Sequence, residues 1–584
     1  MKSLIALIQD DFETACHALF PSVNQEEIPL EITVSTQEKF GHYQFNSAMK
    51  LTKILQTNPR KIAEQFVDYL NQKKIPYIEK LEIAGPGFIN IYLNPKELSE
   101  RVNYILHDSK LGVSSNNSHK KIIIDFSSPN TAKEMHVGHL RSTIIGDSLA
   151  RIFEFLGNDV LRLNHIGDWG TAFGMLIAYM KEEASDVLNG KQDTDLSHLV
   201  TWYKKSKEKF DTDPVFKKKS QQEVVALQGG NKDSLRAWEI ICTISEKAYQ
   251  EIYDLLDVHL VTRGESFYNP MLKDIITELE QKNLIVVSYG AKCLYLDGFI
   301  NREGQPLPLM VQKSDGGFNY DTTDMAAIKH RIFDEKADRL IYVTDAGQST
   351  HFQMIFQAAK KAGFLNDKKV ELDHVPFGLV LGSDGKKFKT RSGDTERLKD
   401  LLTTAIDKAL ILVKERNHEM SEEEQSQLAK ALGIGAVKYA DLSCNRIGDY
   451  VFSYDKMLKF EGNTAAFLMY AYVRINGIKK KVNQSVDQLI EQKLPIILEH
   501  PSELALAFYL TRFGEVLDSV AKDLLPNRLA DYLYGLSEKF NAFFRDCRVE
   551  GDLQQNSRLL LCEATARVLK QGLYLLGLQT VEKM

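Results

Sequence analysis

Two closely spaced histidines form the pattern in this sequence that is best suited to chemistry. His136-Val137-Gly138-His139 follows an apolar run at 121–126 and precedes a helical apolar pattern that starts at Leu140. A loop that leaves the carboxyl end of a parallel strand and enters a helix N-terminus is a common place for phosphates to bind. Gly138 would let a ligand approach the backbone closely, and the two imidazoles could donate hydrogen bonds to phosphate oxygens as charge builds there. The pattern predicts a nucleotide site.

A glycine-flanked basic segment is the second candidate. It runs from Gly385 to Gly393 with the sequence Gly-Lys-Lys-Phe-Lys-Thr-Arg-Ser-Gly. Its cations could close over a triphosphate as a clamp, and the alternative is a solvated surface loop. The candidate phosphate ligands in it are Lys387, Lys389 and Arg391.

These residues need a fold that brings strand ends next to a helix start. Residues 121–126 form a continuous apolar run, as expected of a strand that is covered on both faces. Apolar residues then recur at helical spacing through 140–156, and a second strand is expected at 160–165. Further strands are expected at 340–344 and 375–381. Strand, crossover helix and strand together predict an α/β fold with a Rossmann-type parallel sheet.

The chain divides into four predicted parts. Residues 1–112 form a small α+β module, with a hairpin around Gly85-Pro86-Gly87 and a polar linker at 114–118. Residues 113–400 form the Rossmann-type domain, which a Lys- and Glu-rich, mostly helical connective insertion interrupts at about 180–315. Residues 401–455 are a helical connector and residues 456–584 an all-α bundle. Within the bundle, the apolar spacing from Leu506 to Val520 predicts one amphipathic helix.

Composition excludes several classes of protein. The 584 residues are 43% hydrophobic and 26% charged with a net charge of −6, which is typical of a multidomain globular protein and not of a polybasic one. The six cysteines are scattered without a CxxC pair, so neither a metal site nor a disulfide framework is expected. Apolar runs are too short for a membrane span or a signal peptide, which predicts a cytoplasmic protein.

Residues 126–143 closely resemble the signature of class I arginyl-tRNA synthetases, and His136-Val137-Gly138-His139 matches the HIGH motif of that family. The resemblance extends over essentially the whole chain. Three further blocks match in the expected order: Gly167-Asp168-Trp169-Gly170, Tyr320-Asp321-Thr322-Thr323-Asp324, and Phe460-Glu461-Gly462-Asn463-Thr464 leading into Tyr470-Ala471-Tyr472-Val473-Arg474. The resemblance implies ATP-dependent ligation of L-arginine to tRNA(Arg) through an arginyl-adenylate, with release of AMP and pyrophosphate.

The expected substrate carries a guanidinium, which is planar, always cationic and rich in donors, so its pocket needs carboxylates and aromatic or amide partners. Tyr320 and Asp324 are four residues apart and would share one helical face. They match the side-chain recognition pair of the family. The other positions that the resemblance assigns to arginine binding are Ser128, Asn130, Gln348 and, across an insertion of uncertain register, Glu265.

The basic segment departs from the family pattern. Class I enzymes usually carry a KMSKS loop whose second lysine supports the pyrophosphate, and the sequence 385–393 retains only part of it. Many bacterial arginyl enzymes have a similar loop, and a lysine just before the HIGH motif is thought to compensate. Lys133 occupies that place. Which of Lys133, Lys387, Lys389 and Arg391 carries the main role stays open.

The resemblance also implies surfaces for tRNA. The terminal bundle is similar to the anticodon-binding domain of the family, and single-stranded bases are read by stacking on aromatic side chains and by hydrogen bonds. Tyr470, Tyr472 and Arg474 are candidates there, with core packing as the alternative. Phe88 and Asn90 match positions that contact the tRNA elbow, although a packed hairpin would also explain them. The lysines of the insertion form either a solvated helix face or a tRNA-facing surface.

Two other functions were weighed against arginine–tRNA ligation. A non-catalytic synthetase-like tRNA-binding protein should lack the histidines or the phosphate lysines, and a class I ligase for another amino acid should lack the N-terminal module and Asp324. The expected partners are tRNA(Arg), L-arginine and ATP with Mg²⁺ as one substrate complex. No tightly bound cofactor and no membrane partner are expected, and the protein is expected to be a monomer.

Overall fold

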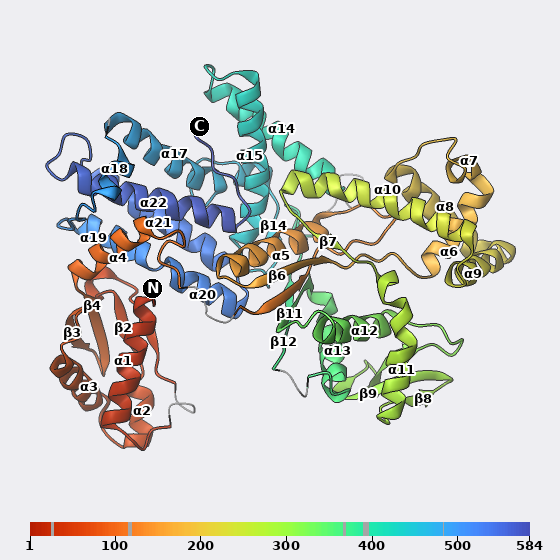
Figure 1. Cartoon of the computed structure of the whole chain (residues 1–584), viewed down its shortest axis with the longest axis horizontal. Coiled ribbons are helices and arrows are strands. Elements are labelled where there is room, and N and C mark those ends of the chain that lie inside the picture. Colours follow the sequence, from red (N-terminus) through yellow and green to blue (C-terminus); the bar gives the residue numbers. More distant parts are fainter. Residues whose placement is uncertain (25–28, 115–118, 366–368, 389–395, 483) are drawn as a thin grey trace. The chain divides into compact units, whose positions relative to one another are not determined.

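A computed structural model describes residues 1–24, 29–114, 119–365, 369–388, 396–482 and 484–584 (Figure 1). Most of the predicted linker at 114–118, together with Lys389 and Arg391, therefore lies outside the described residues. The chain forms two compact units. One contains residues 117–459 and 576–578, and the other contains residues 1–116, 460–575 and 579–584.

The first unit is built on a parallel sheet of five strands with the order β12-β11-β5-β6-β7. Its central strand, β5 (Lys121–Asp125), pairs in parallel with β6 (Asp159–Asn164) on one side and with β11 (Arg339–Asp345) on the other. The edges are β7 (Val261–Thr262) and β12 (Glu371–Phe377). The isoleucines of β5 are fully buried, as expected of a strand covered on both faces. The prediction of a Rossmann-type α/β domain is confirmed.

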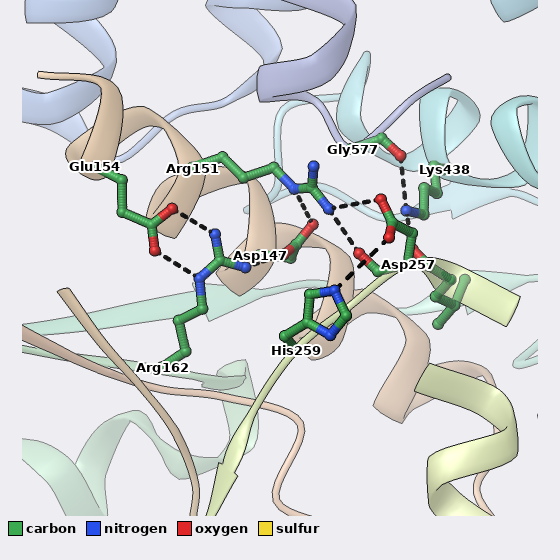
Figure 2. A network of polar contacts seen from close by, with 9 residues as sticks. Asp147, Arg151, Glu154, Arg162, Asp257, His259, Lys438 and Gly577 are labelled. Carbon is green, nitrogen blue, oxygen red and sulfur yellow. Dashed lines mark hydrogen bonds and ion pairs between the residues drawn. The ribbon is translucent and has the colours of Figure 1, made fainter. Parts of the chain in front are cut away.

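The crossover helix α5 (Val137–Phe155) carries the two histidines at its start. It lies close to the residue that follows β5, because a Cβ on Gly146 would be only 2.2 Å from Cγ of Phe126. Farther along, Asp147 of α5 bonds both Arg151 and Arg162 at 2.8 and 2.6 Å (Figure 2). These contacts fix the helix, and with it the histidines, against the sheet.

The same ion network reaches three other segments of this unit (Figure 2). Arg151 donates to the carbonyl of Asp257 at 2.6 Å. Lys438, on α15 (Glu422–Leu442), is buried and donates to the carbonyls of Leu256 and of Gly577, the latter at 2.7 Å. Burial lowers the pKa of Lys438 to about 8. A three-residue segment near the C-terminus is thus part of the first unit.

The insertion between the halves of the sheet is helical only in its first part. Its helices are α6 (Thr171–Glu183), α7 (Ser185–Leu188), α8 (Leu196–Thr212), α9 (Pro214–Gln228), α10 (Lys232–Leu256) and, after η2 (Glu265–Met271), α11 (Leu272–Gln281). The strands β8 (Val286–Ser288), β9 (Ala291–Ile300) and β10 (Pro306–Gln312) follow as an antiparallel sheet. The insertion is mostly helical, as predicted, but the strands at 286–312 were not predicted. In β9 the buried residues are Ala291, Cys293, Leu294 and Leu296. A high content of Lys and Glu does not reveal such a pattern of burial.

The remaining helices of this unit follow the sheet and lead to the connector. They are α12 (Tyr320–Phe333), η3 (Ala346–Gln348), α13 (Ser349–Lys361), α14 (Leu398–Arg416) and α16 (Tyr454–Met457). A two-stranded parallel pair joins β13 (Val380–Leu381) to β14 (Tyr450–Val451). Arg141 of α5 is fully buried and donates to the carbonyl of Gly378 at 2.7 Å, which ties the histidine helix to the segment that leads into the basic loop.

The second unit combines both ends of the chain. Its N-terminal part is an antiparallel sheet of order β1-β2-β4-β3, and the hairpin around residues 85–87 is confirmed. The elements are α1 (Leu4–Leu19), β1 (Ile32–Val34), η1 (Glu38–Phe40), β2 (Tyr43–Phe45), α2 (Ala48–Leu55), α3 (Pro59–Lys73), β3 (Ile78–Ala84), β4 (Phe88–Leu93) and α4 (Pro95–His107). Glu515, from the C-terminal part, accepts hydrogen bonds from Tyr43 Oη at 2.6 Å and from the backbone N–H of Ile5 at 3.1 Å.

The C-terminal part is an all-α bundle, as predicted. Its helices are α17 (Ala465–Val482), α18 (Val486–Glu491), α19 (Pro501–Thr511), α20 (Phe513–Asp523), α21 (Asn527–Asp546) and α22 (Gln555–Leu575). The prediction of one helix from Leu506 to Val520 is wrong, because the helix breaks at Arg512, whose N–H bonds the carbonyl of Tyr509 at 3.2 Å. A break of one residue preserves the apolar face, so spacing alone does not reveal it. Within the described ranges, no helix is long and apolar enough to cross a membrane.

Candidate active site

The loop between β5 and α5 has a strained backbone. Ser127, Ser128 and Ala132 have φ angles of 71°, 46° and 60°, a region that residues other than glycine seldom adopt. Each such residue costs on the order of 1 kcal/mol and persists only where its surroundings hold it. Ser142 Oγ accepts from the N–H of Ser127 at 2.9 Å, and Asn164 Oδ1 accepts from the N–H of Ser128 at 3.0 Å. Neighbouring elements therefore set the shape of this loop.

Two tyrosines of α10 hold the loop from the insertion. The Tyr249 hydroxyl lies 2.7 Å from the carbonyl oxygens of both Asn130 and Lys133. The Tyr253 hydroxyl bonds Ser127 Oγ at 2.8 Å. The sequence pattern does not indicate either tyrosine, because both lie more than a hundred residues from the loop that they support.

The histidines cap the helix that they begin. His136 Nδ1 accepts from the N–H of Gly138, and His139 Nδ1 accepts from the N–H of His136, both at 3.1 Å. Because each Nδ1 is an acceptor, each ring in its neutral form carries its proton on Nε2. Burial is the main cause that lowers the pKa of His136 and takes the pKa of His139 to about 3. At neutral pH the pair therefore offers two uncharged Nε2–H donors at a helix N-terminus.

The charges of two lysines act on the histidines. The charge of Lys387 further lowers the pKa of His136, and the charge of Lys133 is a minor cause of the low pKa of His139. Lys387 is on a short hairpin in which the N–H of Phe388 donates to the carbonyl of Val380 at 2.9 Å. The Lys133 ammonium lies over the ring of Tyr203, 5.5 Å from its centroid. Lys389 and Arg391 lie outside the described residues.

A group of carboxylates lies at the carboxyl ends of the strands. Tyr320 and Asp324 are on the first turns of α12, as predicted, and both face His351. His351 Nε2 is 2.6 Å from Asp324 Oδ2, and its Nδ1 is 3.2 Å from Asp321 Oδ1. The sequence analysis missed His351, although it stands only three residues after the candidate Gln348. Gln348 itself is exposed at the end of η3.

Glu265 belongs to the same group. Burial, followed by the negative charges of Asp324 and Asp168, raises the pKa of Glu265 to about 8. Its position is fixed by the backbone, since its N–H donates to the carbonyl of Ile166 at 3.0 Å. Asp168 accepts from the N–H and the hydroxyl of Ser266 at 2.8 and 2.5 Å. A cation that entered beside Glu265 would lower this raised pKa and be stabilised in return.

Ser128 and Asn130 lie on the same side of the sheet. Ser128 Oγ donates to Asp125 Oδ1 at 2.9 Å and accepts from the N–H of His165 at 3.2 Å. Asn130 is exposed, and its side chain lies directly over Gly167, where a Cβ would be 2.2 Å from Asn130 Oδ1. His165 is half-buried, and desolvation lowers its pKa. The predicted arginine-binding residues therefore lie at or just beyond the carboxyl ends of β5, β6 and β11, with Gln348 three residues after the end of β11.

The candidate tRNA residues occupy different environments in the second unit. Asn90 is 2% exposed, and its Oδ1 accepts from Gln44 Nε2 at 2.7 Å, whereas Phe88 is half-buried at the start of β4. In the bundle, Tyr472 is 6% exposed and lies among core residues. Tyr470 is 40% exposed, with the Arg474 guanidinium 5.0 Å from its ring centroid.

Three family models match the chain. Residues 101–454 match the family of class I tRNA synthetases (R), catalytic domain, residues 468–584 match the DALR anticodon binding domain, and residues 6–93 match the arginyl tRNA synthetase N-terminal domain. The chain is 63% identical to an arginine–tRNA ligase of Protochlamydia amoebophila and 52% identical to one of Chlamydia felis, each over 100% of both chains.

Solved structures give the same result. The crystal structure of arginyl-tRNA synthetase from Plasmodium falciparum is similar over 100% of both chains, with a TM-score of 0.88 and 34% identity. The arginyl-tRNA synthetase of Thermus thermophilus shares the fold, with a TM-score of 0.79 and 22% identity over 100% of both chains. A catalytic family that matches more than half of the chain, together with relatives of high identity over its full length, shows that the chain belongs to the class I arginyl-tRNA synthetases.

Proposed function

We propose that the chain joins L-arginine to tRNA(Arg) in two steps. First, a carboxylate oxygen of arginine attacks the α-phosphorus of ATP in line, which forms arginyl-adenylate and breaks the bond to the bridging oxygen, so that pyrophosphate leaves. Mg²⁺ arrives and acts as part of the ATP substrate complex. The 2′-hydroxyl of the terminal ribose then attacks the carbonyl carbon of the adenylate, its proton is lost, and AMP leaves. No covalent intermediate with the enzyme is needed.

The observation that carries this proposal is the pair of neutral histidines beside a group of carboxylates. His136 and His139 present Nε2–H donors where charge develops on the phosphates, and the strained loop before them holds that geometry in advance. Asp324 and Glu265 offer a cationic side chain two carboxyl groups, of which the second is protonated in the empty pocket. Ser128, Asn130 and Gln348 are assigned to the backbone groups of arginine, and Tyr320 to its side chain.

The remaining assignments concern tRNA. Residues 1–112 would bind the tRNA elbow through Phe88, and residues 456–584 would bind the anticodon through Tyr470 and Arg474. The burial of Asn90 and Tyr472 favours the packing alternative for these two candidates. Residues 113–400 would hold the reaction, and residues 401–455 would connect it to the bundle. We further propose that the protein works as a monomer in the cytoplasm. In the insertion, Lys209 and Lys219 form ion pairs with carboxylates of α6, which supports a structural role for part of that basic surface.

The proposal is tested by charging. Purified protein is supplied with ATP, Mg²⁺, tRNA and each of the twenty amino acids in turn, and only arginine should become esterified. The His139→Ala variant should keep its fold and lose about 100-fold in kcat. Esterification of another amino acid would overturn the pocket assignment. Binding of tRNA without any charging would identify a non-catalytic tRNA-binding protein instead.

The phosphate lysine can be identified in the same assay. Lys133 stands six residues before His139, and its charge acts on His139 without any loop closure. Lys387 instead lies on a hairpin, and its charge acts on His136. We expect Lys133→Ala to lower kcat about 10-fold more than Lys387→Ala or Lys389→Ala, which corresponds to about 1.4 kcal/mol. A larger loss at Lys387 or Lys389 would return the role to the basic loop.

A further inference from the structure

His351 is held between two carboxylates of α12 that lie three residues apart. Its Nδ1 is 3.2 Å from Asp321 Oδ1 and its Nε2 is 2.6 Å from Asp324 Oδ2. The imidazole side chain is only 14% exposed, and it lies on the first turn of α13. Both ring nitrogens therefore point at carboxylate oxygens, and two such bonds require a proton on each nitrogen.

The surroundings favour the charged form of this ring. Burial alone would lower the pKa of His351, but hydrogen bonds to Asp321 and Asp324 raise it to about 9. The other titratable groups that act on this cluster are Tyr320 on α12, Glu265 on η2, His374 on β12, whose pKa is lowered to about 4, His165, whose pKa desolvation lowers, and Tyr342 and Cys293, whose pKa values burial raises. Near neutral pH these groups are uncharged. The two aspartates and the imidazolium together then carry one negative charge.

The two aspartates differ in what remains available to a ligand. Asp321 is buried, and its second oxygen, Oδ2, accepts from Asn319 Nδ2 at 3.1 Å. Asp324 is more exposed, and among the described residues only His351 hydrogen-bonds its carboxylate. Both carboxylate oxygens of Asp321 thus bond side chains of the protein. In Asp324, His351 fixes Oδ2 and the other oxygen stays available to a ligand.

We propose that His351 is a positioning residue for arginine, which orients the Asp324 carboxylate and leaves the cluster of Asp321, Asp324 and His351 with a single negative charge that matches one guanidinium. Without the imidazolium, two carboxylates one turn apart would repel each other, and Asp324 would lose the bond that fixes its plane. This inference rests on the proposed function in one respect: it takes Asp324 to be the partner of the guanidinium.

The test compares the kinetic constants of three variants in arginine charging. His351→Ala removes both hydrogen bonds and the charge, and His351→Gln keeps an amide that can donate to the aspartates without the charge. His330→Gln is the matched control, because His330 lies on α12, is also 14% exposed and has a single carboxylate neighbour, Glu335, at 3.7 Å. We expect the KM for arginine to rise about 10-fold or more in His351→Ala and by a smaller factor in His351→Gln, while kcat and the KM for ATP change less than about 3-fold.

A second measurement does not depend on activity. With ¹³C-labelled histidine, the His351 resonance, assigned by its absence from His351→Gln, should titrate near pH 9 in the wild type and at lower pH in Asp324→Asn. A purely structural histidine would affect stability without this split between KM and kcat.

The outcomes separate the inference from the function on which it rests. Folded His351 variants with an unchanged KM for arginine, beside a wild type that charges arginine, would overturn this inference alone. The same holds for a loss confined to kcat or for an equal effect in His330→Gln. If His351→Ala does not fold, the KM of His351→Gln decides. A wild type that charges no arginine would overturn the proposed function together with this inference.

Discussion

At the scale of single residues, Asp324 carries the assignment of the pocket. It lies with Glu265 and His351 in one electrostatic group, and its carboxylate has an oxygen available to a ligand. Asp324→Asn should raise the KM for arginine strongly and leave the KM for ATP nearly unchanged. Loss of one charged partner of a buried guanidinium should cost about 3 kcal/mol. Asp334→Asn, an exposed site that follows the last turn of the same helix, is the control in steady-state charging. A normal arginine KM in Asp324→Asn would remove the aspartate from the pocket.

His139 should make the stability of the protein depend on pH. Its pKa of about 3 in the folded chain lies below the value of about 6.5 in the unfolded chain, so the unfolded state takes up more protons between these values. The stabilising effect of the neutral ring is complete above about pH 6.5 and is lost as the pH falls toward 3.

His139→Gln should therefore lose less stability than the wild type between pH 7 and pH 4. The difference should reach up to about 1.4 kcal/mol of unfolding free energy per pH unit, and it should appear as a smaller decrease of Tm. Exposed His259 provides the control variant His259→Gln, whose profile should follow the wild type. Parallel profiles for His139→Gln and the wild type would contradict the burial of a neutral ring.

At the scale of elements, the contact between α5 and the end of β5 sets the position of the histidines. A Cβ on Gly146 would meet Cγ of Phe126 at 2.2 Å, and Phe126 is fully buried. Gly146→Ala should destabilise the protein by about 1–3 kcal/mol despite the better helix propensity of alanine. Gly477, inside α17, has no atom within 4 Å of such a Cβ, so Gly477→Ala should instead stabilise by up to about 1 kcal/mol. Urea unfolding of both variants checks the signs, and equal shifts would rule out the steric argument.

At the scale of the whole molecule, the chain crosses from one unit to the other near its end. Helix α22 belongs to the second unit, whereas residues 576–578 belong to the catalytic unit and reach the buried ion network (Figure 2). Gly577 has a φ of 72°, and a Cβ there would lie 3.0 Å from Asp147 Oδ2 and 3.1 Å from Lys438 Nζ. This short segment therefore packs against the buried ion network of the catalytic unit.

Gly577→Ala should destabilise the catalytic unit by the strain of a positive φ and by this close approach, about 2 kcal/mol together. Gly551→Ala isolates the strain, because Gly551 also has a φ of 72° but no atom nearer than 3.9 Å. We expect thermal unfolding to show a lower Tm for Gly577→Ala than for Gly551→Ala. Equal Tm values would mean that the packing of residues 576–578 adds nothing to stability.

The sequence by itself determined the parallel α/β sheet, the N-terminal hairpin and the helical bundle. In each case the information is local: apolar runs of strand length, a Gly-Pro-Gly turn, and helical spacing reflect backbone preferences that need few distant partners. The placement of His136 and His139 at a helix start was predictable for the same reason. The antiparallel strands at 286–312 were not predictable, because they depend on pairing and burial against other elements. The break at Arg512 was not predictable either, because it consists of a local change in backbone hydrogen bonding that leaves the apolar spacing unchanged.

Only the tertiary structure decided how the site is assembled. His351, Tyr249, Tyr253 and Asp168 gain their roles from contacts with residues that lie 27 to 126 positions away in the chain. The protonation of the site residues also depends on the tertiary structure. The low pKa of His139 and the raised pKa of Glu265 follow from burial and from nearby charges. A sequence determines which groups can ionise and where helices and strands begin. The fold determines which of those groups lose water and which charges they face, and these two effects set their protonation and their use.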